Sequence, residues 1–376
     1  MLKIALIGCG KIADSHAVQI ARISGCRIVA ACDLEMLMAR QFADRFAVDQ
    51  AFSDVGQMLR VARPDVVHIT TSPQSHFSLA CQCLEAGSHV YVEKPFTLHT
   101  AEAEKLFAQA NAAGRKLIVG HDDQFSHAAR RLRQTIRDGY LGGPPVHLES
   151  LYCYDLTEPG YAKALLGDKT HWVRRLPGGL LQNVISHGIA RVAEWFTTEH
   201  PTVIAHGFVS PMLRRFDERE IVDELRVIIH EEDRLTAYFT FSSQMRPSLH
   251  AFRVYGPQNG LALDEDQQTV IRLPGRRLKS YAEKFVAPVK LANQHFQNVQ
   301  YNLRRFVHRD FHMKSGMKFL IEEFYRSIAE AGPVPIPQRE VLLTSRIMDD
   351  IFAQLNAARS VPPAATTGAN AHPRQP

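Results

Sequence analysis

A glycine-rich turn near the N-terminus has the spacing that binds a phosphate group. Gly8-Cys9-Gly10-Lys11-Ile12-Ala13 directly follows the apolar run Lys3–Ile7 and leads into a stretch with helical periodicity. The first glycine permits a tight turn, the second lets the backbone approach a pyrophosphate, and the small Ala13 permits close packing of helix on strand. The helix N-terminus also presents its positive dipole end. The turn predicts a dinucleotide site formed by Gly8, Gly10, Lys11, Ile12 and Ala13.

An acidic residue selects between the two forms of such a dinucleotide. Asp33 follows the second apolar run, Arg27–Cys32. Its carboxylate can accept hydrogen bonds from both ribose hydroxyls and would repel a 2′-phosphate. Because no arginine follows within residues 34–37, we expect NAD as the cofactor rather than NADP.

A lysine at the end of a later apolar run is placed to stabilise negative charge. Glu93-Lys94-Pro95 follows Val90-Tyr91-Val92, and the carboxyl ends of parallel strands face the ligand crevice. The Lys94 ammonium can contact a substrate hydroxyl and stabilise the alkoxide that develops as a hydride leaves or arrives. On the tripeptide alone, an exposed Glu-Lys turn is an equally good interpretation.

These residues need a parallel sheet beneath them, and the N-terminal third of the chain has its pattern. Short apolar runs without polar alternation, typical of strands buried on both faces, alternate with helical stretches. The predicted strands are Lys3–Ile7, Arg27–Cys32, Val66–Thr70, His89–Val92 and Leu117–Val119. The predicted helices are Ile12–Ile23, Met36–Phe46, Phe77–Ala86 and Thr100–Ala113. We therefore predict an α/β Rossmann domain, a doubly wound parallel sheet, over residues 1–121.

After Gly120 the apolar runs follow one another with few helices between them. The runs are Val146–Tyr154, Thr202–Val209, Ile221–His230, Leu235–Phe241, Leu249–Tyr255, Leu261–Leu263 and Gln268–Leu273. Helical stretches cover Leu180–Thr197, Met317–Ala331 and Arg339–Ala358. Consecutive strands of this kind indicate a large, mostly antiparallel sheet. We predict an α+β domain for substrate binding and oligomerisation over residues 122–358, and a disordered tail over 359–376.

Four motifs occur in an order typical of one enzyme family. They are the Gly8-x-Gly10 turn, Thr71-Ser72-Pro73-Gln74-Ser75-His76, Glu93-Lys94-Pro95, and Pro177-Gly178-Gly179 followed by His187. In these features the chain resembles the glucose–fructose oxidoreductase, inositol dehydrogenase and rhizopine-catabolism (Gfo/Idh/MocA) family. The resemblance covers residues 1–275 and resumes at Met317–Ile351.

The resemblance implies roles for individual residues. Lys94 would orient the substrate, and His187 would be the general acid/base that takes or returns the hydroxyl proton. The family usually has Asp four residues before this histidine. Here Asn183 stands there, and it can hydrogen-bond a sugar hydroxyl but brings no negative charge. Around the cofactor the resemblance implies Asp33, Thr71, Pro73, His76, Glu93 and Lys94.

Two further positions are candidates for substrate contact. Gln124 stands in the segment His121–Phe125, where the family often has an arginine, so an anionic substrate would find one partner fewer. Trp172, shortly before the Gly-Gly turn, could stack on the nicotinamide or on a sugar, with a packing role equally open. The six scattered cysteines include no paired CxxC ligand set, and we expect no metal site.

The composition is that of an ordinary globular protein with one basic region. The chain has 376 residues, of which 45% are hydrophobic, and carries 44 Lys and Arg against 39 Asp and Glu. No run approaches the roughly 18 apolar residues of a membrane span. The cysteines lie in apolar runs, as small buried side chains in a reducing compartment do. We expect a cytoplasmic protein.

The basic region, residues 276–314, also carries an apolar stripe. Phe285, Val289, Ala292, Phe296, Val299, Leu303 and Phe306 recur at spacings of four and three, which predicts a helix that begins after Pro288. This helix could pack on its own domain or on a second subunit, or residues 285–309 could form a peripheral membrane contact. Nucleic-acid binding ranks last because no known module is present, and we expect no nucleic-acid partner.

Together these features predict an NAD-dependent oxidoreductase that acts on a secondary alcohol or ketone of a sugar, cyclitol or nucleotide sugar. Family members usually pair subunits, so by analogy we expect a homo-oligomer. Two alternatives stay open. One is a regulator that senses NAD or sugars without catalysis, and the other is a sugar epimerase or hydrolase that cycles a tightly bound NAD.

Overall fold

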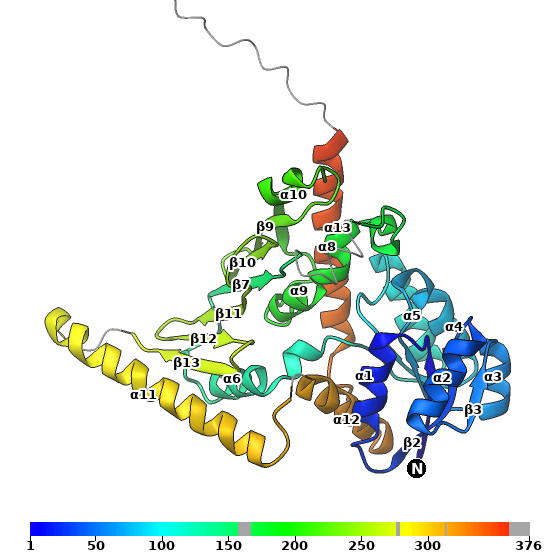
Figure 1. Cartoon of the computed structure of the whole chain (residues 1–376). Helices are drawn as coiled ribbons and strands as arrows, with labels where there is room; N and C mark the ends of the chain where they lie inside the picture. Colours follow the sequence, from blue (N-terminus) through cyan, green and yellow to red (C-terminus); the bar gives the residue numbers. More distant parts are fainter. Residues whose placement is uncertain (157–166, 276–278, 313, 361–376) are drawn as a thin grey trace, which may run out of the picture.

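The computed structural model describes residues 1–156, 167–275, 279–312 and 314–360, and it contains two β-sheets of different kinds (Figure 1). The parallel first sheet and the mostly antiparallel second sheet confirm the predicted fold class. Of the predicted disordered tail, residues 361–376 lie outside the described residues, as do residues 276–278 of the basic region.

The first sheet has six parallel strands in the order β3-β2-β1-β4-β5-β6. The strands are β1 (Leu2–Ile7), β2 (Cys26–Cys32), β3 (Gln50–Phe52), β4 (Val66–Ile69), β5 (His89–Val92) and β6 (Leu117–Val119). The helices are α1 (Lys11–Ile20), α2 (Met36–Phe46), α3 (Val55–Ala62), α4 (His76–Glu85) and α5 (Thr100–Ala112), with a 3₁₀ turn η1 at Pro73–Ser75. The strand order reverses between β1 and β4, and in such sheets the ligand crevice opens at this switch point.

Burial on both faces explains why these strands lack polar alternation. Ile4, Leu6, Val66 and Ile69 are fully buried. Strand β3 and helix α3 were not predicted. β3 spans only three residues with one of them buried, so no apolar run marks it. Helix α3 begins at Asp54, whose side chain accepts a hydrogen bond from the Gln57 amide at 2.6 Å, as a helix-capping residue does.

The second sheet has seven strands in the order β13-β12-β11-β7-β10-β9-β8. The strands are β7 (His147–Cys153), β8 (Thr202–Phe208), β9 (Glu224–Glu231), β10 (Leu235–Ser242), β11 (His250–Tyr255), β12 (Gly260–Asp264) and β13 (Thr269–Leu273). Only the β7–β10 pair is parallel. Side chains alternate between a buried face and an exposed one, as in β10, where Phe239 is buried and Tyr238 is exposed. An antiparallel sheet with one covered face has this alternation.

Short helices join the two sheets and cover the inner face of the second. They are η2 (Asp122–Phe125), α6 (His127–Arg137), η4 (Trp172–Arg175), α8 (Gly179–Val184), α9 (Ser186–Ala193) and α10 (Pro211–Arg215). The single helix predicted over Leu180–Thr197 is therefore two helices, α8 and α9, with Ile185 between them.

The last two helices lie across both halves of the molecule (Figure 1). Helix α12 (Ser315–Ala329) packs against α1 and η2, and its Leu320, Ile321 and Phe324 belong to the core of the first sheet. Helix α13 (Gln338–Ser360) packs against α5 of the first region and against α9 and β8 of the second. The C-terminal segment thus fixes the two sheets relative to each other.

Helix α11 (Ser280–Val307) lies along the outer edge of the second sheet and contains Pro288. The prediction that the helix begins after Pro288 is wrong. A proline removes one backbone N–H from the helix ladder, but residues 284 and 288 are both exposed, so water can pair the carbonyl that loses its donor. In the part of the chain that is described, no helix is both long and apolar enough to cross a membrane.

Candidate functional site

The glycine turn between β1 and α1 leaves open space at the start of the helix. Gly8 has φ +90, and a Cβ placed on it would lie 2.7 Å from the Thr71 side chain, so only glycine fits there. Around Gly10 a Cβ would meet nothing within 4 Å, and no side chain caps α1 at this residue. The first amides of α1 are therefore open to a phosphate. Ala13 is fully buried, while Lys11 is exposed and Ile12 half-buried.

Asp33 is fixed to the same turn. Its carboxylate accepts hydrogen bonds from the backbone amides of Cys9, at 2.7 Å, and Glu35, at 3.0 Å. It therefore stands at the carboxyl end of β2 beside the glycine turn, half-buried, where a ribose attached to a phosphate on α1 would lie. These residues fit NAD.

The Thr71–His76 loop closes over the switch point and is tied to the tripeptide 93–95. His76 is fully buried, with Nδ1 2.9 Å from the Pro95 carbonyl oxygen and Nε2 3.1 Å from that of Thr71. The hydroxyl groups of Thr71 and Ser75 are hydrogen-bonded to each other at 2.7 Å. Pro73 is buried at the start of η1. In this geometry His76 joins the two loops to each other.

A chain of buried polar side chains runs beneath the tripeptide, and we call it the buried histidine chain: Glu93, His16, His68 and Tyr325. Glu93 Oε1 lies 2.8 Å from His16 Nε2, the Nδ1 atoms of His16 and His68 are 2.9 Å apart, and His68 Nε2 lies 2.7 Å from the Tyr325 hydroxyl. Burial alone would raise the pKa of Glu93, but the hydrogen bond and charge of His16 outweigh it and lower the pKa to about 2. Glu93 also accepts a hydrogen bond from the Lys94 amide at 3.1 Å. The buried histidine chain therefore holds the tripeptide 93–95 in place.

Lys94 reaches from the first region to the second. Its Nζ donates a hydrogen bond to the backbone carbonyl of Asn183, at the end of α8, at 3.1 Å. Burial lowers the pKa of Lys94, against the opposing effect of the carboxylates of Glu93, Asp122 and Asp123. Asn183 thus binds the lysine through its main-chain oxygen, and the predicted contact of its side chain with a sugar hydroxyl stays a prediction.

His187 lies in the first turn of α9 and is 6% exposed. Its Nε2 lies 3.9 Å from Asp122 Oδ1 and its Nδ1 lies 3.8 Å from Asp123 Oδ2, and Nδ1 has no hydrogen-bond partner among the described residues. Burial lowers its pKa to about 4, although Asp123 opposes the shift. At neutral pH the imidazole is therefore uncharged and able to accept a proton.

Asp122 and Asp123 complete what we call the cleft cluster: Lys94, His121, Asp122, Asp123 and His187. Burial and the neighbouring Asp123 raise the pKa of Asp122, against the charge of Lys314. For Asp123, burial is outweighed by His187, Arg191 and a hydrogen bond of 2.8 Å from the Tyr152 hydroxyl, so its pKa is lowered. The two adjacent carboxyls thus differ in proton affinity, as an acid and a base do.

Five of these contributors were not singled out from the sequence: His121, Asp122, Asp123, Tyr152 and Lys314. Asp122 follows β6, and the rule that identified Lys94, a polar residue at the carboxyl end of a parallel strand, could have found it. Lys314 comes from the start of α12. That helix approaches η2 closely because Gly316 leaves no side chain against the Asp122 carbonyl. No local signal in the sequence indicates that approach.

The cleft cluster also contains donors that a metal could use. One nitrogen of His187 and one oxygen each of Asp122 and Asp123 lie within 4.8 Å of one another, and divalent cations accept this ligand type. Two ammonium groups, those of Lys94 and Lys314, act on the same cluster. Their positive charge opposes the binding of a metal cation there.

Gln124 and Trp172, the predicted substrate contacts, make other contacts in the structure. The amide nitrogen of Gln124 donates to Glu194 at 2.8 Å and to the Ala190 carbonyl at 3.2 Å, and its side chain is buried against α9. The backbone oxygen of Trp172 accepts from Gln74 at 3.3 Å, and its half-buried ring packs on the second core. Gln74 lies in the 71–76 loop, so this contact links η4 to the first region.

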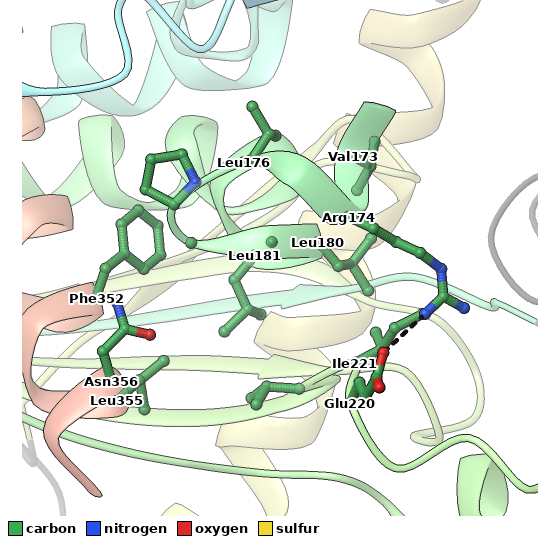
Figure 2. Close-up of a pocket in the computed structure, with 14 residues that line it drawn as sticks. Val173, Arg174, Leu176, Leu180, Leu181, Glu220, Ile221, Phe352, Leu355 and Asn356 are labelled. Carbon is green, nitrogen blue, oxygen red and sulfur yellow. Dashed lines mark ion pairs between the residues drawn. The ribbon is translucent and has the colours of Figure 1, made fainter. Parts of the chain in front are cut away.

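The Gly-Gly turn that precedes His187 has a packing explanation. A Cβ on Gly178 would lie 2.5 Å from the Phe352 ring of α13, and Gly179 has φ +56, a conformation that favours glycine. Figure 2 shows Phe352 beside this turn, at a cavity of about 300 Å³ that also takes in Arg174 and Glu220, whose charged groups are 3.8 Å apart. Neither Lys94 nor His187 lines this cavity. The turn therefore lets α8 begin close against α13, on a side of α8 that does not face Lys94 or His187.

Comparison with known proteins places the N-terminal region in a family. Residues 2–121 match an oxidoreductase family with an NAD-binding Rossmann fold, GFO_IDH_MocA. A D-apiose dehydrogenase from Paraburkholderia graminis is 33% identical over 140 residues, which are 37% of this chain and 37% of that protein. A D-glucoside 3-dehydrogenase from Escherichia coli is 30% identical over 142 residues, 38% of this chain and 40% of that protein. The matches therefore span about two fifths of these relatives' length.

Solved structures resemble the chain over nearly its whole length. The WlbA dehydrogenase from Bordetella pertussis, in complex with NADH and UDP-GlcNAcA, has a TM-score of 0.74 at 14% identity and covers 95% of this chain and 96% of its own. UDP-N-acetylglucosamine 3-dehydrogenase GnnA from Acidithiobacillus ferrooxidans has a TM-score of 0.69 at 18% identity, covering 95% and 98%. At these identities the likeness shows that both halves share the fold.

Proposed function

Through its NAD-binding domain this chain belongs to the Gfo/Idh/MocA oxidoreductase family, and from that premise we propose that it is an NAD-dependent oxidoreductase acting on a CH–OH group of a sugar-like substrate. The observation that carries the proposal is the position of Lys94. It follows β5 at the ligand edge of the first sheet, and its ammonium reaches the end of α8, close to His187. A lysine and an imidazole thus lie near each other at the switch point.

The cofactor would be held by residues of the first region. The open amides at the start of α1 suit the pyrophosphate, and Asp33 suits the adenosine ribose. NAD, when bound, would supply a hydride acceptor or donor at the nicotinamide ring. Related proteins act on D-apiose, on D-glucosides and on UDP-N-acetylglucosamine, to judge from their names, so sugars and nucleotide sugars are the first substrates to test.

The protein's own groups would manage charge and proton. In the oxidation direction, the neutral His187 takes the hydroxyl proton, since its pKa near 4 leaves it unprotonated at neutral pH. Lys94 stabilises negative charge on the reacting oxygen. In the reverse direction the same His187 returns the proton to the oxygen, and Asp122, whose pKa is raised and whose Oδ1 lies 3.9 Å from His187 Nε2, can resupply the proton to the imidazole. The half-buried Asn183, whose main-chain oxygen binds Lys94, could orient a hydroxyl with its side-chain amide.

The test measures NADH formation over a panel of free sugars, inositols and nucleotide sugars. Lys94→Met should lower turnover by roughly 10³-fold or more, because the charge-stabilising group is lost, while the dissociation constant for NAD changes less than about threefold. Lys105→Met, an exposed lysine on α5, is the matched control and should behave as wild type. Wild-type turnover in Lys94→Met would refute the assignment. Sugar binding without any NADH signal would favour a sensing protein, and product without net NADH would favour redox cycling.

A further inference from the structure

Helix α11 is bound to the second sheet through its polar face. Asn298 Oδ1 accepts from the Val270 amide at 3.0 Å and its Nδ2 donates to the Val270 carbonyl at 3.1 Å. Gln294 repeats the pattern at Arg272, accepting at 2.7 Å and donating at 3.1 Å. The two amides thus pair the free edge of β13 as a further strand would, which protects the edge from pairing with other chains. This contact fixes which face of α11 points away from the sheet.

The face that points away is apolar and exposed along the whole helix. Its large side chains have exposed fractions of 53% to 75%, and they are Tyr281, Phe285, Val289, Phe296, Val299, Leu303, Phe306 and Val307. The polar side chains lie inside and the apolar ones outside, the reverse of a helix that packs on its own core. In Figure 1 the first turns of α11 project beyond the strands of the sheet. The helix therefore packs on its own domain, as one of the alternatives had it, but through polar side chains, while the described residues leave its apolar stripe exposed.

The area of the stripe suits a protein partner. Three Phe and one Tyr, at about 150–250 Å² each, leave on the order of 500 Å² of aromatic surface in water before the aliphatic residues are added. The largest apolar patch of a typical monomer is about 300–600 Å² in total, and a stable interface needs about 800 Å² per partner. The whole stripe therefore has the size of one half of an interface.

The spacing of the stripe indicates what the partner is. From Phe285 to Phe306 the apolar positions alternate by four and three, which is the a/d pattern of a coiled coil. The positions that border this seam, e and g, hold no Lys, Arg, Asp or Glu within the helix: they are Val286, Pro288, Asn293, His295, Gln300, Asn302 and Val307. The basic residues Lys284, Lys290, Arg304 and Arg305 occupy b and c positions, away from the seam.

We propose that α11 is a self-association helix whose apolar seam packs against the same seam of a second copy of this chain. A like-charged helix can pair with itself only if its charges keep clear of the contact, and here they do. An interfacial helix also carries its Lys and Arg on the polar face, so the basic residues alone do not distinguish a membrane from a second helix, and the strict a/d spacing decides. The narrow seam with uncharged borders favours an isologous pair.

The test compares the mass of the full chain in solution, by sedimentation, for wild type and two variants of the same helix. Phe296→Glu/Leu303→Glu places like charges in the seam of both copies and should halve the mass of the assembly. Gln297→Glu adds a charge at an exposed b position and should leave the mass unchanged. The milder Phe296→Ala/Leu303→Ala should raise the dissociation constant at least about tenfold, because apolar area is lost without added charge.

Two results would overturn the proposal. One is a wild-type chain that stays monomeric at tens of micromolar, and the other is an assembly whose mass the Glu variant does not change. Vesicles of phosphatidylserine provide a third readout. Sedimentation of a monomeric wild type with them, lost in the Glu variant, would assign the stripe to a membrane instead. A single cooperative thermal unfolding transition in every variant would show that each is folded.

Discussion

Two polar clusters lie on either side of residues 93–94, and they differ in how completely their atoms are paired. In the buried histidine chain both nitrogens of His16 and of His68 have partners at 2.7 to 2.9 Å. In the cleft cluster, neither nitrogen of His121 has a partner among the described residues, nor does Nδ1 of His187. Buried polar atoms are normally paired. The buried histidine chain therefore has a structural role. In the cleft cluster we expect a bound ligand to supply the missing hydrogen-bond partners.

The largest effect that tests this contrast is on turnover. His187→Gln keeps a polar side chain but removes the proton acceptor, so turnover should fall by about 10² to 10³-fold, typical of a lost general base. The free energy of unfolding should change by less than about 1 kcal/mol, since the atom removed is unpaired. Steady-state kinetics beside urea unfolding measure both. Full activity, or a loss of stability as large as in the histidine chain, would break the contrast.

The pH profile sharpens the same point. With a pKa of about 4, His187 is neutral from about pH 5 upwards. Its titration should therefore produce no rising or falling limb in the plot of oxidation rate against pH between about pH 6 and 8. A limb in that range would belong to Asp122, whose pKa is raised, and Asp122→Asn should remove it. Persistence of the limb in that variant would contradict the assignment.

A smaller effect, on stability, should come from the paired cluster. The pKa of Glu93 falls from 4.5 to about 2 on folding, so its ionised form stabilises the fold above pH 4.5, and this contribution is lost as the pH falls towards 2. Glu93→Gln should lower the free energy of unfolding by about 3 kcal/mol at neutral pH and by much less near pH 3. Urea unfolding at both pH values measures it. Glu104→Gln, which removes an exposed ion pair with Arg346, should cost under about 0.5 kcal/mol.

The smallest effects are a pair with opposite signs. His68→Phe leaves His16 and Tyr325 without their partner and should destabilise the protein by about 2 kcal/mol. His121→Phe removes two unpaired nitrogens from a 2%-exposed site and should stabilise the ligand-free protein by about 1 kcal/mol. Thermal unfolding of the two variants under one condition gives the comparison. Equal signs would show that pairing does not distinguish the clusters.

Much of the first region could be predicted from the sequence because its signals are local. The glycine turn, the strand that precedes it and the tripeptide after β5 each lie within a few residues, and burial on both faces gives the strands uniform apolar runs. Strand β3 was not predicted because three residues are too few to form an apolar run. The antiparallel strands were predictable for the same reason, since alternation with one covered face is visible within each strand.

The site was less predictable wherever distant segments meet. Lys314 and Asp122 are brought together by the approach of α12 at Gly316, and Tyr152 reaches Asp123 from the second sheet. No short-range pattern encodes such meetings. Asn183 and His187 stand four residues apart in a stretch that was predicted as one helix, but the break at Ile185 separates them into two helices. Sequence spacing predicts a common face only while the helix is continuous.

The hydrogen bond between His68 and Tyr325 has a consequence for biosynthesis. The first sheet is made early, yet the hydroxyl that satisfies its central imidazole arrives only after 257 further residues have been translated. A nascent N-terminal region on the ribosome would hold an unsatisfied ring in its interior, and domains that emerge first usually try to fold first. We expect a fragment that ends at residue 121 to stay loosely packed, and to reach native packing only when the segment that contains Tyr325 is present.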